Sequence, residues 1–287
     1  MSNDLQAAAQ EFLVRYGGDT FPNLFTSAKG TIVKDSNGRE YLDFTSGQMC
    51  ATIGHNHPAI VEAVNRAGQK AFHFFSGMIP EVVAELAQTL ARDWLPGEIR
   101  KTIFINTGSE ATEVALRMAK MYTDGYEILA LGGSWHGITG GASSVSMASD
   151  RKGYGVPSPG VFVIPEPNAY RPYMKGLSED ESALAGLEMA LKLFDMQSTG
   201  RGAAIIVEPV ISAGGRAGAA PLLHAGPAQS RRRPRHVADL RRGADGVRAH
   251  RDENRIGIFR RRPGHHDDVE DAGRRPAARG GRNNGED

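Results

Sequence analysis

The sequence predicts an α/β protein, and three observations on its first 215 residues support this. Short runs of consecutive apolar residues alternate with segments of helical periodicity, which predicts parallel strands buried on both faces and covered by helices. The single cysteine, Cys50, excludes a disulfide framework and is typical of a reducing compartment. No apolar run approaches membrane-spanning length, and residues 1–10 lack a signal-peptide core, so we expect a cytoplasmic protein without membrane contact.

The first hundred residues predict three helices and one hairpin. An amphipathic helix is expected over 5–16. The dipeptide Asn37-Gly38, flanked by apolar runs, predicts a tight hairpin because this pair readily adopts positive φ. Further helices are expected at 58–72, with Pro58 in the first turn, and at 80–95.

From residue 102 onward the pattern alternates between strand and helix. A helix is expected over 110–122, and another between the last two strands, with an inward face made by Leu184, Leu187, Leu191 and Phe194. The expected strands are 102–105, 127–131, 161–164 and 204–207. Ligands of parallel sheets bind at the carboxyl ends of the strands, so polar residues that follow these strands are the candidate site residues.

Thr107, Gly108 and Ser109 lie between the first of these strands and its helix. Backbone N–H groups at a helix N-terminus bind a dianion, glycine lets the backbone approach, and the hydroxyls add donors. The three residues therefore form a candidate phosphate site. The alternative is a plain N-cap by Thr107 or Ser109.

Three other motifs have alternative interpretations. Trp135, after the second strand, can stack on a flat cofactor, or it can be a core residue beside a capping His136. Glu208, after the last strand, can orient a cofactor or guide a substrate amine, or it can be an exposed strand-end residue. His55 and His57 suggest a metal, but further ligands at suitable spacing are missing, so a loop or helix start is favoured.

The composition changes after Gly215. Residues 216–287 hold half of the 34 Lys and Arg residues, all of them Arg, and contain no Lys, Met, Tyr, Trp or Cys. One interpretation is a non-enzymatic protein whose basic tail binds nucleic acid. The favoured interpretation is a GC-rich gene read out of frame, which gives a disordered tail with too few large apolar side chains to fold and no nucleic-acid partner.

Taken together and in this order, the motifs resemble the class III aminotransferases, which bind pyridoxal 5'-phosphate in fold type I. Within that family the resemblance is strongest to the 2,2-dialkylglycine decarboxylases, because Trp135 stands where most relatives have Phe or Tyr. The matching segments are 43–58, 106–120, 134–137 and 208–215, and the resemblance covers residues 10–215. It implies a mostly parallel sheet flanked by helices, with 1–50 in a small domain and 51–215 forming part of the cofactor-binding large domain.

The resemblance also implies roles for individual residues. Thr107, Gly108 and Ser109 would hold the phosphate, and Trp135 would stack on the pyridine ring, with His136 beside it. Glu208 would neighbour the cofactor, and Gln48 would lie by the substrate carboxylate that leaves as carbon dioxide. Phe74 and Ser76 match positions that help bind K+ or Na+. An amino acid and a 2-keto acid would be the substrates, and a homodimer or tetramer the assembly.

The family requires an Asp, a Gln and a Schiff-base Lys beyond Gly215, and none appears in the printed sequence. In the neighbouring reading register, the codons for 236–247 permit MWLIFDEAQTG, and those for 263–287 permit PDIMTMSKTLGGGLPLAAVVTTAK. The Lys codon in that register spans Glu270 and Asp271. We therefore expect a frameshifted, truncated and catalytically inactive chain.

Two activities stay open for the intact enzyme. The first is the decarboxylation of a dialkylglycine coupled to the transamination of pyruvate, which Gln48 and Trp135 favour. The alternative is an ω- or 4-aminobutyrate-type aminotransferase, which removes a proton instead of carbon dioxide. Ala213 and Ile138 depart from the decarboxylase pattern and leave the substrate choice open.

Overall fold

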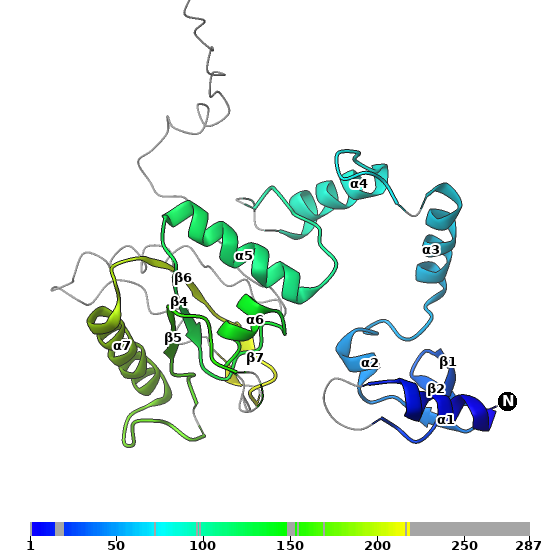
Figure 1. Cartoon of the computed structure of the whole chain (residues 1–287), viewed down its shortest axis with the longest axis horizontal. Coiled ribbons are helices and arrows are strands. Elements are labelled where there is room, and N and C mark those ends of the chain that lie inside the picture. Colours follow the sequence, from blue (N-terminus) through cyan, green and yellow to red (C-terminus); the bar gives the residue numbers. More distant parts are fainter. Residues whose placement is uncertain are drawn as a thin grey trace, which may run out of the picture. The chain divides into compact units, whose positions relative to one another are not determined.

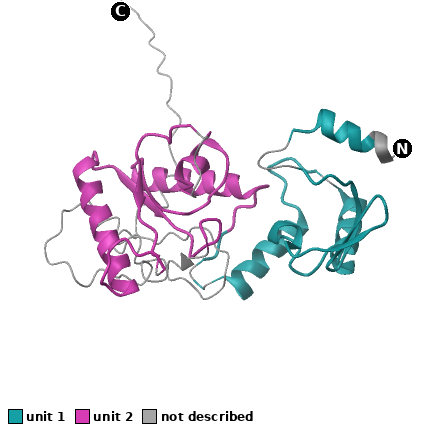
Figure 2. Ribbon diagram, turned by 90° about the horizontal axis from the view of Figure 1, so that it is seen from below, with its two compact units in different colours: residues 1–101 teal, residues 102–287 magenta. Residues whose placement is uncertain are grey.

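The computed structural model describes residues 2–218, apart from 15–19, 72, 96, 98, 148–152, 154, 169 and 216. The chain divides into two units, residues 1–101 and 102–287 (Figure 2). Most of the predicted tail, residues 219–287, therefore lies outside the described residues. The division of the chain into 1–50 and 51–215, which the resemblance implies, differs from the boundary after residue 101 and stays a prediction.

The first unit begins with helix α1 (Ser2–Phe12) and an antiparallel sheet in the order β1-β2-β3. Its strands are β1 (Phe25–Lys29), β2 (Ile32–Asp35) and β3 (Glu40–Leu42). The predicted hairpin between β2 and β3 is confirmed, with Gly38 at a φ of 83°. The Asp35 carboxylate closes the turn by accepting hydrogen bonds from the Asn37 and Arg39 amides, at 2.9 and 3.0 Å.

Four helical segments complete the first unit: α2 (Ser46–Met49), α3 (Pro58–Lys70), α4 (Glu81–Thr89) and the π-helix η1 (Leu90–Trp94). His57 caps α3, because its Nδ1 accepts from the Ala59 amide at 3.3 Å. The favoured interpretation of His57 as part of a helix start is thus confirmed. Within the described part of the chain, no group of three or more His, Cys, Asp or Glu residues could hold a metal ion.

The second unit is a parallel sheet in the order β5-β4-β6, with helices on both faces (Figure 1). Its elements are α5 (Gly108–Thr123), β4 (Glu127–Leu131), α6 (Gly140–Val145), β5 (Val161–Ile164), α7 (Glu179–Gln197) and β6 (Gly202–Ile206). A short antiparallel pair follows, formed by β7 (Val210–Ile211) and β8 (Ala217–Gly218).

All five residues of the central strand β4 are buried. Leu129 and Leu131 pack in one cluster with Phe194 of α7. Ile128 and Ala130 pack in the other, which includes residues of α5 and α6. Because successive side chains of a strand point to opposite faces, this arrangement requires an uninterrupted apolar run, as the sequence predicted.

Two predictions from the periodicity are wrong. Residues 102–105 form no strand in the structure, and Ile103 is 59% exposed. A strand is defined by its ladder partner, and apolarity alone does not supply one. Leu184 of α7 is 40% exposed, whereas Ala183, Ala190, Leu191 and Phe194 are buried. Leu184 lies only about 20° from Leu191 around the helix axis, so the helical period does not separate the two residues, and burial also depends on the position along the helix.

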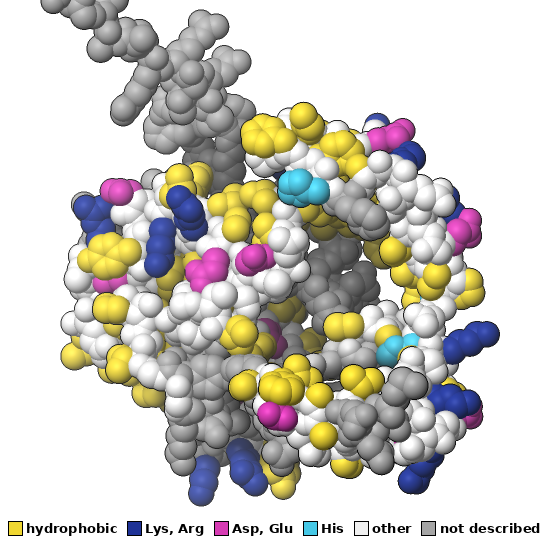
Figure 3. Space-filling model, turned by 45° about the vertical axis from the view of Figure 1, so that its right-hand side comes forward, with side chains coloured by type: hydrophobic (Ala, Val, Ile, Leu, Met, Phe, Trp, Pro, Cys, Tyr) yellow, Lys and Arg dark blue, Asp and Glu magenta, His cyan; other side chains and the backbone are white. Residues whose placement is uncertain are grey.

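The described surface carries many hydrophobic side chains (Figure 3). Helices α3, α4 and η1 contain no buried residue. Among the described helices, none is long and apolar enough to cross a membrane.

Candidate cofactor site

The first turn of α5 begins at a complete capping box. The Glu110 amide donates to Thr107 Oγ1 at 3.1 Å, and the Thr107 amide donates to Glu110 Oε2 at 3.0 Å. The N-cap interpretation of Thr107 is therefore confirmed. The amides at the start of a helix have no acceptor within it, so those of Gly108 and Ser109 can bind an anion. A Cβ added at Gly108 would meet no atom within 4 Å, so described atoms leave space beside this turn.

Trp135 opens the segment that we call the tryptophan loop, residues 135–139. The loop follows β4 at its carboxyl end, and Gly132 there donates to the Ile164 carbonyl of β5 at 2.7 Å. Trp135 is 38% exposed, so the interpretation as a core tryptophan is wrong. An indole that is partly open at this edge of a parallel sheet can stack on a flat ring.

His136 is buried, and its backbone is bound on both sides. Its amide donates to Ser146 Oγ at 2.8 Å, and its carbonyl accepts from Thr112 Oγ1 at 2.9 Å. Burial lowers the pKa of His136 to about 4, so the imidazole is neutral near pH 7. Its Nε2 is buried without a hydrogen-bond partner among the described residues. The structure thus places His136 inside the fold, and its predicted part in cofactor binding stays a prediction.

Glu208 follows β6 and joins two segments of the site. One carboxylate oxygen, Oε1, accepts a hydrogen bond from the Trp135 amide, and the other, Oε2, accepts from the Ser212 amide at 3.0 Å. Glu208 is half-buried, so the interpretation as an exposed strand-end residue is wrong. Close by, a Cβ at Gly214 would lie 2.2 Å from the Gly133 carbonyl oxygen, so only glycine permits this approach.

One face of α5 holds the tryptophan loop, and the sequence analysis missed it. Ser109 Oγ accepts from the Ile138 amide at 3.1 Å, and Thr112 binds the His136 carbonyl. Glu113 binds the end of the loop and the start of α6. The available signal was the spacing of polar residues 109, 112 and 113, since positions three and four apart share a helix face.

Gln48 belongs to the first unit, where it occupies a left-handed turn. Residues 46–49 have φ values of 49°, 56°, 60° and 67°, and only Gly47 adopts such values at little cost. The Asp43 carboxylate anchors the turn, accepting from Thr45 Oγ1 at 2.6 Å, from the Gly47 amide at 2.8 Å and from His55 Nε2 at 2.7 Å. These bonds hold the pKa of Asp43 well below its usual range, with the Thr45 hydroxyl the largest cause.

Such a strained turn, held by its neighbours, is typical of functional segments. Phe74 and Ser76 also lie in the first unit, between α3 and α4, and both are exposed. The predicted roles of Gln48, Phe74 and Ser76 stay predictions.

A family model described as aminotransferase class III matches residues 14–227. The chain belongs to the class III aminotransferases. This class III aminotransferase chain is 44% identical over 207 residues to an uncharacterized aminotransferase of Schizosaccharomyces pombe, covering 72% of this chain and 46% of that protein. It is 33% identical over 202 residues to the 5-aminovalerate aminotransferase DavT of Pseudomonas aeruginosa, with coverages of 69% and 46%. The chain thus spans less than half the length of these two relatives.

Solved structures confirm the fold class. The taurine:2-oxoglutarate aminotransferase of Bifidobacterium kashiwanohense, solved with PLP and glutamate, aligns with a TM-score of 0.64 at 25% identity. The alignment covers 74% of this class III aminotransferase chain and 48% of that structure. The predicted α/β fold, a parallel sheet flanked by helices, is therefore confirmed.

Proposed function

We propose that this chain forms the phosphate-binding and ring-binding part of a pyridoxal 5'-phosphate site. The observation that carries the proposal is the hydrogen bond between Ser109 Oγ and the Ile138 amide. It ties the first turn of α5, where a phosphate would bind, to the loop that begins with an exposed indole. A ligand with a phosphate and a flat ring at fixed separation suits this pair of features.

Each residue supplies a different part of the binding. The Gly108 and Ser109 amides, at the N-terminus of α5, would donate hydrogen bonds to the phosphate. In the capping box Thr107 Oγ1 acts as an acceptor, so its hydroxyl proton can be donated to the phosphate as well. Trp135 would cover one face of the ring, and Glu208 fixes the Trp135 backbone. When bound, the cofactor supplies an electron sink for negative charge at the substrate's α carbon.

Binding can be tested with pyridoxamine 5'-phosphate, which needs no lysine to bind. The sequence has two tryptophans, Trp94 and Trp135, so Trp94→Phe leaves a single reporter in the site. In the full chain we expect Trp135 fluorescence to be quenched on titration. Gly108→Asp should abolish the quenching, since the new carboxylate enters the phosphate space while favouring the helix N-terminus.

Gly97→Asp is the matched control, because a Cβ at Gly97 also meets no atom within 4 Å. It should leave the titration unchanged. Equal quenching in the parent and in the Gly108→Asp variant would place the ligand elsewhere and reject the proposal.

We also propose that the chain as printed does not turn over substrate, because it holds no lysine after Lys192 to bind the cofactor covalently. The decoded motifs support a shift of reading frame near Gly215. Sequencing the gene under Glu270 and Asp271 tests this, and the absence of an out-of-register AAG would overturn it. A borohydride-stable lysine adduct of the cofactor on the purified chain would overturn the claim of inactivity.

For the frame-repaired enzyme, two substrate classes are supported by different observations. Trp135 and Gln48 support decarboxylation of a dialkylglycine with pyruvate as amino acceptor. The similarity to a 5-aminovalerate aminotransferase supports an ω-amino acid donor instead. Assay of the repaired protein with 2-aminoisobutyrate and pyruvate separates them, because only the decarboxylase releases carbon dioxide and acetone.

A further inference from the structure

The tryptophan loop is held at both ends by carboxylates that come from different parts of the second unit. Glu208, after β6, binds the amide of Trp135 at the start of the loop. Glu113, on α5, accepts from the Thr139 hydroxyl at 2.6 Å at the end of the loop. The loop backbone is therefore fixed to the sheet at one end and to the phosphate-binding helix at the other.

A single oxygen of Glu113 accepts three hydrogen bonds. Oε1 accepts from the Thr139 hydroxyl and from the Gly141 and Ala142 amides, the latter two at 2.8 and 3.1 Å. These amides belong to the first turn of α6, where a negative charge is stabilised by the helix dipole. Burial tends to raise the pKa of Glu113, but the hydrogen bonds from Thr139, Ala142 and Gly141 outweigh it, and the pKa lies below its usual value.

Two glycines allow the loop to lie this close to α5. A Cβ at Gly141 would lie 2.4 Å from Glu113 Oε2. A Cβ at Gly137, whose φ is 131°, would lie 2.9 Å from Ser109 Cα. A side chain at Gly137 would push the loop away from the α5 backbone, whereas a side chain at Gly141 would displace the Glu113 carboxylate from the start of α6.

We propose that Glu113 is a positioning residue that sets the distance between the Trp135 indole and the first turn of α5. The proposal rests on the proposed function, since that distance matters only to a ligand that engages both features. Without the Glu113 carboxylate, Thr139, Gly141 and Ala142 lose their common acceptor, while Glu208 still holds the Trp135 amide and Ser109 and Thr112 still bind the middle of the loop. The end of the loop is then released from α5, and the separation between the indole and the phosphate site varies over a wider range.

The proposal makes a prediction that a general loss of stability does not. A ligand that contains both a phosphate and a ring binds well only when the distance between the Trp135 indole and the first turn of α5 is correct. Inorganic phosphate contacts only the first turn of α5, so its affinity does not depend on that distance. In the full chain carrying Trp94→Phe, Glu113→Ala should weaken pyridoxamine 5'-phosphate binding about tenfold. The affinity for inorganic phosphate, measured by competition, should stay unchanged, and the fluorescence anisotropy of Trp135 without ligand should fall.

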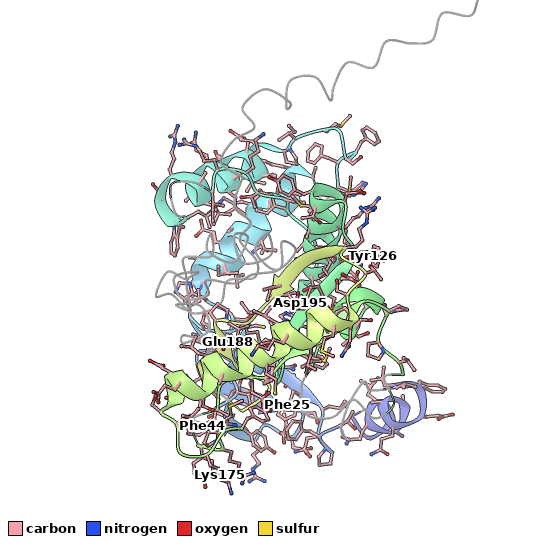
Figure 4. The ribbon with its side chains drawn as sticks, turned by 90° about the vertical axis from the view of Figure 1, so that its left-hand side faces the viewer. Phe25, Phe44, Tyr126, Lys175, Glu188 and Asp195 are labelled. Atoms are coloured by element: carbon pink, nitrogen blue, oxygen red, sulfur yellow. The ribbon has the colours of Figure 1, made fainter. Side chains whose placement is uncertain are left out.

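Two variants accompany this measurement. Glu113→Gln keeps an oxygen at Oε1 and should restore binding to within about threefold of the parent. Glu188→Ala, an exposed glutamate on α7 (Figure 4), is the matched surface control and should change nothing. If Glu113→Ala does not fold, Glu113→Asp, which keeps the charge and shortens the reach, gives the same comparison.

Unchanged affinity for pyridoxamine 5'-phosphate in Glu113→Ala would overturn the proposal, and so would an equal loss for both ligands. A parent that binds no pyridoxamine 5'-phosphate would instead reject the proposed function. In that case the anisotropy of Trp135 in the ligand-free chain still decides whether Glu113 fixes the loop.

Discussion

The two units differ in how they use their apolar residues. In the second unit, all five residues of β4 are buried between helices on both faces. In the first unit, α3, α4 and η1 have amphipathic sequences, yet none of their residues is buried. In a parallel sheet, the helices that connect successive strands pack on the sheet and cover its apolar faces. The helices of the first unit have no such covering among the described residues, whereas the candidate phosphate and ring site lies in the second unit, which has the larger buried core.

The largest expected effect follows from this difference in burial. Leu129→Ala removes a side chain that is 0% exposed and should destabilise the second unit by about 4 kcal/mol. Leu86→Ala in α4, where the side chain is 47% exposed, should lower the free energy of unfolding of the first unit by well under half of that amount. Hydrogen exchange, followed separately in the two units, would measure the loss of stability in each variant. Equal losses would contradict the proposed difference in burial between the units.

The buried carboxylate of Glu127 makes the second test. It accepts from Ser198 Oγ at 2.5 Å, from the Thr199 amide at 2.7 Å and from the Arg201 amide at 3.1 Å. Glu127→Ala would leave these donors without an acceptor and should cost about 3 kcal/mol. The measurement is the urea unfolding midpoint, with loss of exchange protection at Thr199 and Arg201. Protection retained at both amides would show that the carboxylate is dispensable.

His136 gives the second unit a pH dependence. Its pKa of about 4 lies below the ordinary value of 6.5, so the unfolded chain binds the proton first as the pH falls. Stability from this group is complete above pH 6.5 and falls as the pH drops toward 4, by about 2 kcal/mol between pH 7.5 and 5. His136→Gln should flatten this part of the profile in chemical unfolding, and an identical slope in both proteins would contradict it.

The smallest effect compares the two helix caps. Thr107→Ala removes a capping box and should destabilise α5 by about 1 kcal/mol. His57→Ala removes only the 3.3 Å bond to the Ala59 amide and should cost less. Helix-specific exchange rates would rank the two, and a larger loss at α3 would reverse the comparison.

Local signals in the sequence were sufficient for most of the elements. Asn37-Gly38 indicated the hairpin, Pro58 the start of α3, and Thr107 the start of α5. Residues 102–105 show where such signals fail, because an apolar run becomes a strand only when a neighbour pairs with it. The same limit applies to Leu184, which shares a helix face with the buried Leu191 and is nevertheless 40% exposed.

The candidate site divides in the same way. Thr107, Gly108, Ser109 and Trp135 could be selected from the sequence because each follows or opens an element with a clear pattern. Asp43 binds Thr45 and Gly47, two and four positions away, and the His55 side chain. For Glu113 the spacing of polar residues on α5 indicates a helix face, but it does not indicate the partner, because Glu113 acts through backbone groups of another segment. Glu113 binds amides 28 and 29 positions away, and no local spacing in the sequence encodes that partnership.

By itself, the sequence determined the alternation of strands and helices, the capped helix start at Thr107 and the sharp change in composition after Gly215. These depend on residue types and short spacings, which act within one or two turns of chain. Only the tertiary structure decided which carboxylates hold the tryptophan loop, and that residues 46–49 wind to the left. Such features arise from contacts between distant segments, whose free energies are set by the packing of the folded chain.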